Sequence, residues 1–254
     1  LDILRNGIVM PAPVRDGAAT ELNEIATKLN SQYGQGKGML GGEEINGSDI
    51  EAEMGNLERT PAELAEMWTS WHDNVGAPMR EDYQRMIAIA NEGSKELGFA
   101  DLGAMWRSNY DMDPDQFAAE TERMWLEVKP LYMALHTYVR GKLNAKYGAE
   151  VQPADGPIRA DLLGNMWAQE WGNIYPLVAP EGAGDIGYDL TDLIAAKGLD
   201  EIQMVRTGEG FFSSLGFEPL PDTFWERSQF VKPRDREVVC HASAWDVDNV
   251  DDLR

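Results

Sequence analysis

Apolar residues near the start of the chain recur with the spacing of a helix that buries one face. In residues 19–34, ATELNEIATKLNSQYG, the apolar positions fall three or four residues apart, which places them on one side of a helix. Gly34 follows the last of them and predicts the helix end, because glycine readily adopts the backbone of a C-terminal cap. The apolar positions are Leu22, Ile25, Ala26, Leu29 and Tyr33.

The next stretch, residues 34–44 (GQGKGMLGGEE), is rich in glycine. A glycine loop with a lysine can cradle phosphate, but Lys37 is followed by Gly38 where a phosphate loop has serine or threonine. No predicted strand precedes it either. We interpret this stretch as a flexible connection.

A second helix is predicted from Thr60 onward. Thr60 is a good N-cap, Pro61 suits the first helical position, and Glu63 completes a capping box. The apolar stripe that follows consists of Leu64, Met67, Trp68, Trp71 and Val75.

The same start pattern returns at Asp113, Pro114 and Gln116 and predicts a much longer helix. Pro130 lies inside it and predicts a kink, because proline removes one backbone donor and crowds the preceding turn. The stripe comprises Phe117, Met124, Trp125, Val128, Leu135, Val139, Leu143 and Tyr147.

The remainder of the chain also favours helices. Residues 158–175 (IRADLLGNMWAQEWGNIY) show a helical pattern, and Gly198 and Gly216 predict the ends of two later helices, with Asp200 as N-cap of the second. Only a short β element near residues 237–244 is expected, where two adjacent valines favour a strand. The predicted fold class is therefore mostly α.

Composition changes this picture little, but charge excludes some functions. The chain has 254 residues, 43% of them hydrophobic, as in ordinary globular proteins. Its net charge of −22 opposes contacts to phosphate, so we expect no nucleic-acid partner. No apolar run approaches the roughly 18 residues that would indicate a membrane-spanning helix, and the first residues do not have the pattern of a signal peptide.

The chemistry that the residues themselves suggest is limited. The three histidines, His72, His136 and His241, show no metal-ligand spacing, so we expect no metal site in this chain. His241 could donate to a substrate carbonyl, although a packed structural role is the more common one. The small residues after it, Ala242 to Ala244, leave a strand edge open to an extended peptide.

Two further clusters each have a functional and an ordinary interpretation. Trp167 and Trp171 are four apart on the predicted helix, a spacing more typical of a core, while the amide of Gln169 could recognise a carboxylate or peptide. In WRSNYD, Arg107 could bind an anion and Tyr110 could donate a hydrogen bond, or the two could form a surface pair.

Several motifs together resemble the angiotensin-converting enzyme family of peptidyl-dipeptidases. They are WRSNYD, LLGNMWAQEWGNIYPLV, FFSSLGFEPLP, FW and REVVCHASAWD, in that family's order and at about its spacings. The likeness extends back through WTSWHDNVG to ELNEIATKLNSQYGQGKG and so covers nearly the whole chain.

This resemblance implies a zinc metallopeptidase that removes dipeptides from the C-terminus of oligopeptides. It also implies a helical, zincin-type fold with a deep central channel. The family holds zinc through H-E-x-x-H and a later glutamate, which follow the HASAWD motif. Residues 1–254 are thus expected to be the N-terminal and substrate-channel part of one domain, ending before the zinc helix and inactive alone.

The resemblance assigns roles to individual residues. It implies that His241 hydrogen-bonds the substrate carbonyl near the scissile bond, and that the backbone at Ala242 and Ala244 pairs with bound peptide. Gln169 corresponds to the residue that grips the substrate's terminal carboxylate, and Trp167 to the wall beside it.

Two family features, chloride and a disulfide, are only partly matched. Tyr110 corresponds to a tyrosine at one chloride site, whereas His72 stands where members often have the arginine of the other, which weakens that site. Cys240 corresponds to a cysteine whose partner lies beyond this chain. A disulfide there would imply a periplasmic or extracellular location, and the absence of the family's earlier cysteine pair fits a bacterial member.

Two other functions remain as alternatives. The first is a non-catalytic helical module that binds peptides without a metal. The second is a helical glycosidase that uses two carboxylates, for which the abundance of acidic residues and tryptophans is the only support. A zinc motif encoded beyond Arg254 would favour the peptidase, and a stop codon there would favour the binding module.

Overall fold

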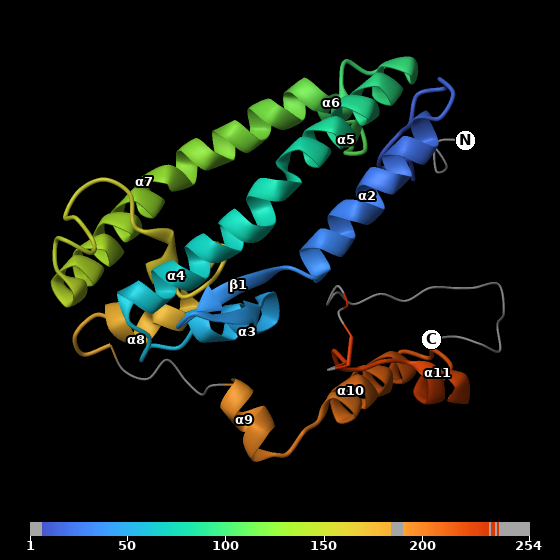
Figure 1. Ribbon diagram of the computed structural model, residues 1–254. Helices are drawn as coiled ribbons and strands as arrows, with labels where there is room; N and C mark the ends of the chain where they lie inside the picture. Colours follow the sequence, from blue (N-terminus) through green and yellow to red (C-terminus); the bar gives the residue numbers. More distant parts are fainter. Residues whose placement is uncertain (1–6, 184–189, 234, 237, 239–254) are drawn as a thin grey trace. The chain divides into compact units, whose positions relative to one another are not determined.

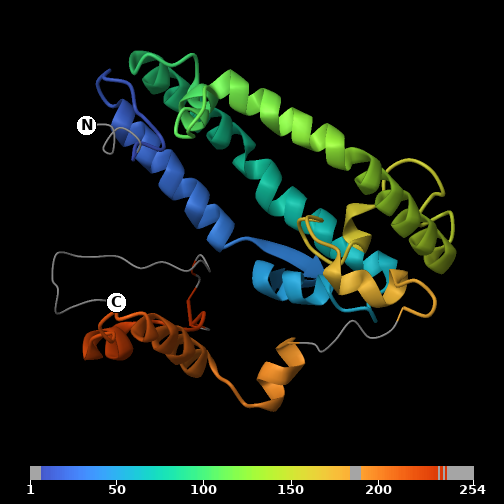
Figure 2. The ribbon, with the colours of Figure 1, turned by 180° about the vertical axis from the view of Figure 1, so that it is seen from behind.

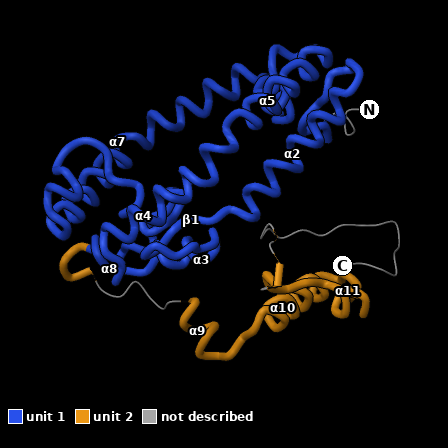
Figure 3. Tube along the Cα trace, in the orientation of Figure 1, with its two compact units in different colours: residues 1–179 blue, residues 180–254 orange. Residues whose placement is uncertain are grey.

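The computed structural model describes residues 7–183, 190–233, 235, 236 and 238. The chain divides into two compact units, residues 1–179 and residues 180–254 (Figure 3). The described residues are mostly helical, with one short two-stranded sheet, so the predicted fold class is confirmed. Of residues 237–244 only Val238 is described, and the β element expected there stays a prediction.

Long helices form the frame of the first unit. α2 (Ala18–Gly34), the consecutive helices α4 (Pro61–Trp71) and α5 (Ala77–Glu96), and α7 (Pro114–Tyr147) are its longest elements. Both ribbon views place α4 and α5 in the middle, with α2 along one side and α7 along the other (Figures 1 and 2).

The predicted first helix is confirmed as α2. Leu22 and Leu29 of its stripe are buried, while Tyr33 is exposed. Charged residues also join it to α5, since Glu21 pairs with Arg85 at 2.6 Å. α2 therefore lies against α5 and is joined to it by this ion pair.

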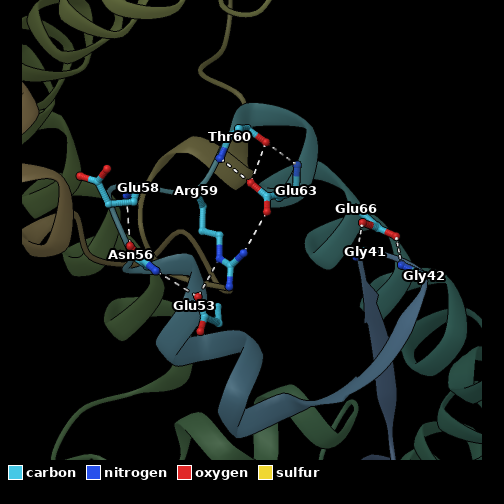
Figure 4. Close-up of polar contacts among 9 residues, drawn as sticks. All are labelled: Gly41, Gly42, Glu53, Asn56, Glu58, Arg59, Thr60, Glu63 and Glu66. Carbon is cyan, nitrogen blue, oxygen red and sulfur yellow. Dashed lines mark hydrogen bonds and ion pairs between the residues drawn. The ribbon is translucent and has the colours of Figure 1, made fainter.

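The glycine-rich stretch is not a flexible connection, and that prediction was wrong. It forms an antiparallel hairpin of β1 (Lys37–Leu40) and β2 (Glu43–Asn46), in which Gly38 faces Ile45. Side chains of α4 hold the hairpin in place. Ser70 Oγ accepts from the Met39 amide at 2.8 Å, and the Glu66 carboxylate accepts from both amides of the Gly41–Gly42 turn (Figure 4).

The predicted α4 is also confirmed, including its start. Thr60 Oγ1 accepts from the Glu63 amide while the Glu63 carboxylate accepts from the Thr60 amide (Figure 4). Pro61 is the first helical residue. Its buried stripe faces α3 (Gly47–Met54) in the main core. The most buried members of that core include Ile50, Met54, Met67, Trp71, Val139, Leu143, Leu162 and Ile174.

A π-helical turn, η1 (His72–Gly76), connects α4 to α5. A π-turn inserts an extra residue into the helix, and such turns are frequent at functional sites. The end of α5 packs on α6 (Leu102–Arg107), where Asn91 Oδ1 accepts from the Leu102 amide at 2.9 Å.

The long helix predicted after Asp113 is confirmed as α7, one continuous helix (Figure 1). Pro130 lies inside it. Asp113 is its N-cap, but its carboxylate accepts from the Asp115 amide rather than from that of Gln116. Its apolar stripe is buried only toward the C-terminal end. Several earlier members are exposed, namely Met124, Trp125, Val128 and Leu135.

The continuous helix expected over residues 158–175 is not present. The segment contains two single 3₁₀ turns, η2 (Ala160–Leu162) and η3 (Gly172–Ile174), with an irregular turn between them, and then joins α8 (Tyr175–Val178). The irregular turn carries two of the candidate site residues.

The second unit contains α9 (Leu190–Ala196), α10 (Glu201–Ser214) and α11 (Asp222–Arg227). The predicted caps are confirmed. Asp200 forms a capping box with Gln203 at the start of α10, and Gly198 and Gly216 have φ of 63° and 95° after α9 and α10. Ring contacts connect its aromatic residues, including Phe211, Phe212, Phe217, Phe224, Trp225 and Phe230.

Candidate functional site

Residues 164–171 (GNMWAQEW) form a turn in which two residues have a positive φ. Gly164 has a φ of 75°, which glycine adopts easily. Ala168 has a φ of 52° and is the one non-glycine residue with positive φ in the described part of the chain. Residues with a Cβ avoid this region at a cost of about 1 kcal/mol or more. The surrounding contacts must therefore hold Ala168 in place.

Those contacts begin with a buried amide, that of Asn165, which is only 2% exposed. Its Oδ1 accepts from the Trp167 amide at 2.8 Å, and its Nδ2 donates to Glu51 Oε1 of α3, also at 2.8 Å. Glu51 Oε2 accepts in addition from the Met166 amide at 3.2 Å. The indole of Trp68 donates to the Met166 carbonyl at 3.1 Å. The turn is thus hydrogen-bonded from α3 and α4.

Trp167 projects from this turn into an aromatic group. Its ring stacks with that of Tyr33, at 6.4 Å between centroids and 23° between planes. It also meets the edge of His72, whose own ring lies 4.0 Å from that of Trp68. Trp167 stays 44% exposed. The structure therefore brings Trp167 and His72, two of the residues singled out in the sequence, to one place.

Gln169 follows Ala168 directly and is exposed. Trp171, two residues later, faces another group of rings on α7, those of Tyr132 and His136. The predicted helical pairing of Trp167 with Trp171 was wrong, because the residues between them form the turn. Gln169 is exposed in the same turn, two residues after Trp167.

His72 is engaged by its own helix. Its Nδ1 lies 2.6 Å from the carbonyl oxygen of Trp68, which can only accept, so Nδ1 carries the proton and donates. One ring nitrogen therefore remains for any further contact. The residue stands at the start of the π-turn, half-buried against Trp68.

Tyr110 lies away from this group. Its ring stacks on Phe117 with centroids 4.1 Å apart, and it is largely exposed. Tyr110 follows α6, whose first residue is hydrogen-bonded to Asn91 of α5. Asn91 is 19 residues after His72, which at the rise of a helix corresponds to about 28 Å along the axis. The two candidate chloride residues are thus at different ends of α5. Near Tyr110, Nε of Arg107 is buried and has no hydrogen-bond partner among the described residues.

Four candidates, Cys240, His241, Ala242 and Ala244, lie outside the described residues. Their roles stay predictions. Among the residues that the structure does describe, no three histidine, cysteine or acidic side chains are grouped so that they could hold a metal ion. Over the same residues, no helix is long and apolar enough to cross a membrane.

The polar network between α3 and α4 lies apart from the turn and has a different role. Arg59 donates to Glu53 of α3 at 2.8 Å and to Glu63 of α4 at 2.9 Å (Figure 4). Hydrogen bonds from Arg59 and Asn56 lower the pKa of Glu53. Hydrogen bonds from Thr60 and Arg59 lower the pKa of Glu63. This network fixes the start of α4 and does not reach the turn.

Sequence reasoning missed three residues that build this site: Tyr33, Glu51 and Asn165. Tyr33 was assigned to the apolar stripe of the first helix and so to the protein core. Glu51 is one of 44 Asp and Glu residues, and nothing in the sequence distinguishes it from the others. Asn165 could have been found, because the pair Gly164–Asn165 indicates a turn within an otherwise helical pattern.

Comparison with known proteins identifies the family. The sequence model of the family described as angiotensin-converting enzyme matches residues 3–254. The chain belongs to the angiotensin-converting enzyme family, and the resemblance found in its motifs is confirmed.

The chain matches only part of the length of its relatives. It is 40% identical over 248 residues to angiotensin-converting enzyme of Mesocricetus auratus, covering 96% of this chain and 19% of that protein. It is 47% identical over 188 residues to the Bos taurus enzyme (74% and 14%) and 40% identical over 208 residues to that of Theromyzon tessulatum (82% and 32%). The chain thus spans between 14% and 32% of the length of these relatives.

Proposed function

We propose that this chain forms part of the substrate-binding wall of a zinc-dependent peptidyl-dipeptidase, which releases dipeptides from the C-terminus of oligopeptides. The observation that carries the proposal is the family match over residues 3–254. The hydrogen-bonded turn that carries both Trp167 and Gln169 agrees with it, because an exposed aromatic ring and an exposed amide are groups that can bind a peptide.

The residues of this chain do not fit a zinc site. Its three histidines are 64 and 105 residues apart, and it contains no H-E-x-x-H motif. We therefore propose that the zinc ligands belong to another part of the protein, and assign only substrate binding to this chain. Alone, the 254 residues should not hydrolyse peptides. Zinc-dependent release of dipeptides by the purified chain, abolished by a chelator, would contradict this.

Within this proposal Gln169 binds the terminal carboxylate, with Trp167 as the wall next to it. His241 donates to the carbonyl of the scissile bond, whose oxygen gains charge in the transition state. The backbone at Ala242 and Ala244 pairs with the peptide as an added strand. Tyr110 is proposed for chloride binding, and His72 for a weakened second chloride site. An extracellular or periplasmic location, with Cys240 in a disulfide, completes the proposal.

The test separates the roles of His241 and Gln169 in the protein translated from the complete reading frame. His241→Ala should lower kcat about a hundredfold, which is typical for loss of one transition-state donor. Gln169→Ala should mainly raise KM, because the terminal carboxylate changes little during the reaction.

The measurement is steady-state kinetics on a tripeptide with a free C-terminus and on its amidated form. Wild type should prefer the free acid, Gln169→Ala should lose part of that preference, and His241→Ala should retain it. Equal loss in both variants, or in neither, would show that these roles are wrong.

A further inference from the structure

The carboxylate of Glu51 is the contact through which α3 reaches the turn that carries Trp167 and Gln169. α3 itself is firmly placed, because Ile50 and Met54 on either side of Glu51 are buried in the main core. One oxygen of Glu51 accepts from Asn165 Nδ2 and the other from the Met166 amide. A single side chain, 114 residues away in sequence, thus contacts two successive residues of the turn.

The direction of these hydrogen bonds also fixes the amide of Asn165. A carboxylate can only accept, so the Asn165 group facing Glu51 must be its NH₂. The carbonyl oxygen of Asn165 is then directed to the Trp167 amide, from which it accepts at 2.8 Å. If the amide were reversed, NH₂ would face the N–H of Trp167 and both partners would lose a bond. Glu51 makes the shorter of two carboxylate contacts to this NH₂, at 2.8 Å against 3.5 Å for Glu170, and so orients the amide that holds Trp167.

The residue after Trp167 has an unfavourable backbone conformation, which the hydrogen bond between Asn165 Oδ1 and the Trp167 amide helps to maintain. Ala168 occupies the left-handed region at φ 52°, which an alanine leaves unless its surroundings prevent it. The bonds on its N-terminal side come from Asn165, whose main-chain carbonyl accepts from the Ala168 amide at 3.0 Å. Gln169 is the next residue, so the direction of its side chain depends on this conformation.

We propose that Glu51 is a positioning residue for the peptide-binding wall: through Asn165 it holds the 164–171 turn in the conformation that presents Trp167 and Gln169. Its effect on peptide selectivity rests on the proposed function, whereas its effect on the turn does not. Glu51 itself touches neither peptide nor reacting atoms in this scheme.

The strongest test exchanges donor and acceptor across the contact. Glu51→Gln alone places an NH₂ against either Asn165 Nδ2 or the Met166 amide, so two donors face each other. Adding Asn165→Asp restores a complementary arrangement, because the amide introduced on α3 can then donate to the carboxylate introduced in the turn and still accept from Met166. That carboxylate would also face Glu170, which lies 3.5 Å from Asn165 Nδ2 but is exposed and can turn to water.

A matched control comes from the same helix. Glu53→Gln weakens the contact of α3 with Arg59 of the α4 start but leaves the turn untouched. A merely structural role for Glu51 would give similar results for Glu51→Gln and Glu53→Gln. All variants are made in the protein translated from the complete reading frame.

Two measurements are compared. Hydrogen exchange of the Met166 and Trp167 amides should be about tenfold faster in Glu51→Gln, as expected when a buried hydrogen bond is lost, and should return toward wild type in Glu51→Gln/Asn165→Asp. The preference for a free-acid over an amidated tripeptide should follow the same order. Glu53→Gln should change neither.

Each outcome decides the proposal. Unchanged exchange in Glu51→Gln, equal changes in Glu53→Gln, or no recovery in the double variant would overturn it. If exchange responds as expected but wild type shows no free-acid preference, the positioning role stands and the proposed function fails. Should Glu51→Gln not fold, a folded double variant with wild-type exchange supports the proposal, and its failure to fold overturns it.

Discussion

Helices α4 and α7 start with the same kind of sequence and end up in different surroundings. Each has a polar N-cap, a proline at the first helical position and an apolar stripe. In α4 the stripe residues Leu64, Met67 and Trp71 are buried. In α7 burial of the stripe is confined to Val139 and Leu143, near its C-terminal end.

The difference shows that a stripe predicts a helix but not what covers it. α4 meets the hairpin, α3 and the segment around η2, which together surround its apolar side. The part of α7 before Val139 has large apolar residues exposed, with Leu131 at 75%.

Truncating a buried and an exposed apolar residue should give very different losses of stability. Met67→Ala in α4 should lower the free energy of unfolding by about 2–5 kcal/mol, because it empties part of a packed core. Leu131→Ala in α7 should change it by less than about 0.5 kcal/mol. Urea unfolding of the 254-residue chain measures both. Similar losses would mean that the exposed half of α7 is covered in solution.

Removing the proline inside α7 should stabilise the chain. Pro130→Ala restores an N–H that can donate to the preceding turn, and it relieves the steric contact of the ring. The expected gain in the free energy of unfolding is about 1–3 kcal/mol, with Lys129→Ala as the neutral neighbour. A loss of stability instead would show that the proline shape is required for packing of α7.

The two N-caps should differ in strength. Thr60→Ala breaks a reciprocal capping box and should cost about 1 kcal/mol. Asp113→Ala removes a carboxylate that, among the described residues, accepts from the Asp115 amide alone, so a loss of roughly half that size is expected. Thermal unfolding of the two variants gives the order. A larger loss for Asp113→Ala would contradict it.

Acid should weaken the start of α4 through Glu63. Hydrogen bonds from the Thr60 amide and hydroxyl, and then from Arg59, lower the pKa of Glu63 below its ordinary value of 4.5. The stabilisation is therefore complete above pH 4.5 and is lost as the pH falls through the lower pKa of the folded state. Glu63→Gln, which has no charge to titrate, should make stability fall less steeply with acid. An unchanged slope would rule out this contribution.

Local signals predicted most of the frame. The caps at Thr60, Asp113 and Asp200 and the glycine ends at Gly34, Gly198 and Gly216 depend on residues within one turn, so the sequence is sufficient to predict them. The hairpin could not be recognised this way. Its strands are held by Ser70 and Glu66, some 25 to 31 residues away.

In the candidate site, too, features set by nearby residues were predicted and features set by distant residues were not. The motifs identified Trp167, Gln169 and His72, and the structure brings Trp167 and His72 together. The predicted helix through Trp167 was wrong because periodicity does not register the distant acceptor, Glu51, that makes a turn favourable there. Propensity from neighbouring residues is overridden where long-range hydrogen bonds satisfy a non-helical backbone.

Three glycines in and directly beside the hairpin have a consequence for protein engineering. A Cβ on Gly47 would lie 2.7 Å from Cη2 of Trp71, and one on Gly36 would lie 2.6 Å from Cγ2 of Val75. Gly38 would likewise meet Cδ1 of Ile50 at 2.7 Å. Because Gly36 and Gly47 have no side chain, the ring of Trp71 can pack directly against their backbone. Replacing Gly36, Gly38 or Gly47 by serine should therefore displace core side chains, although the composition of the stretch resembles that of a replaceable linker.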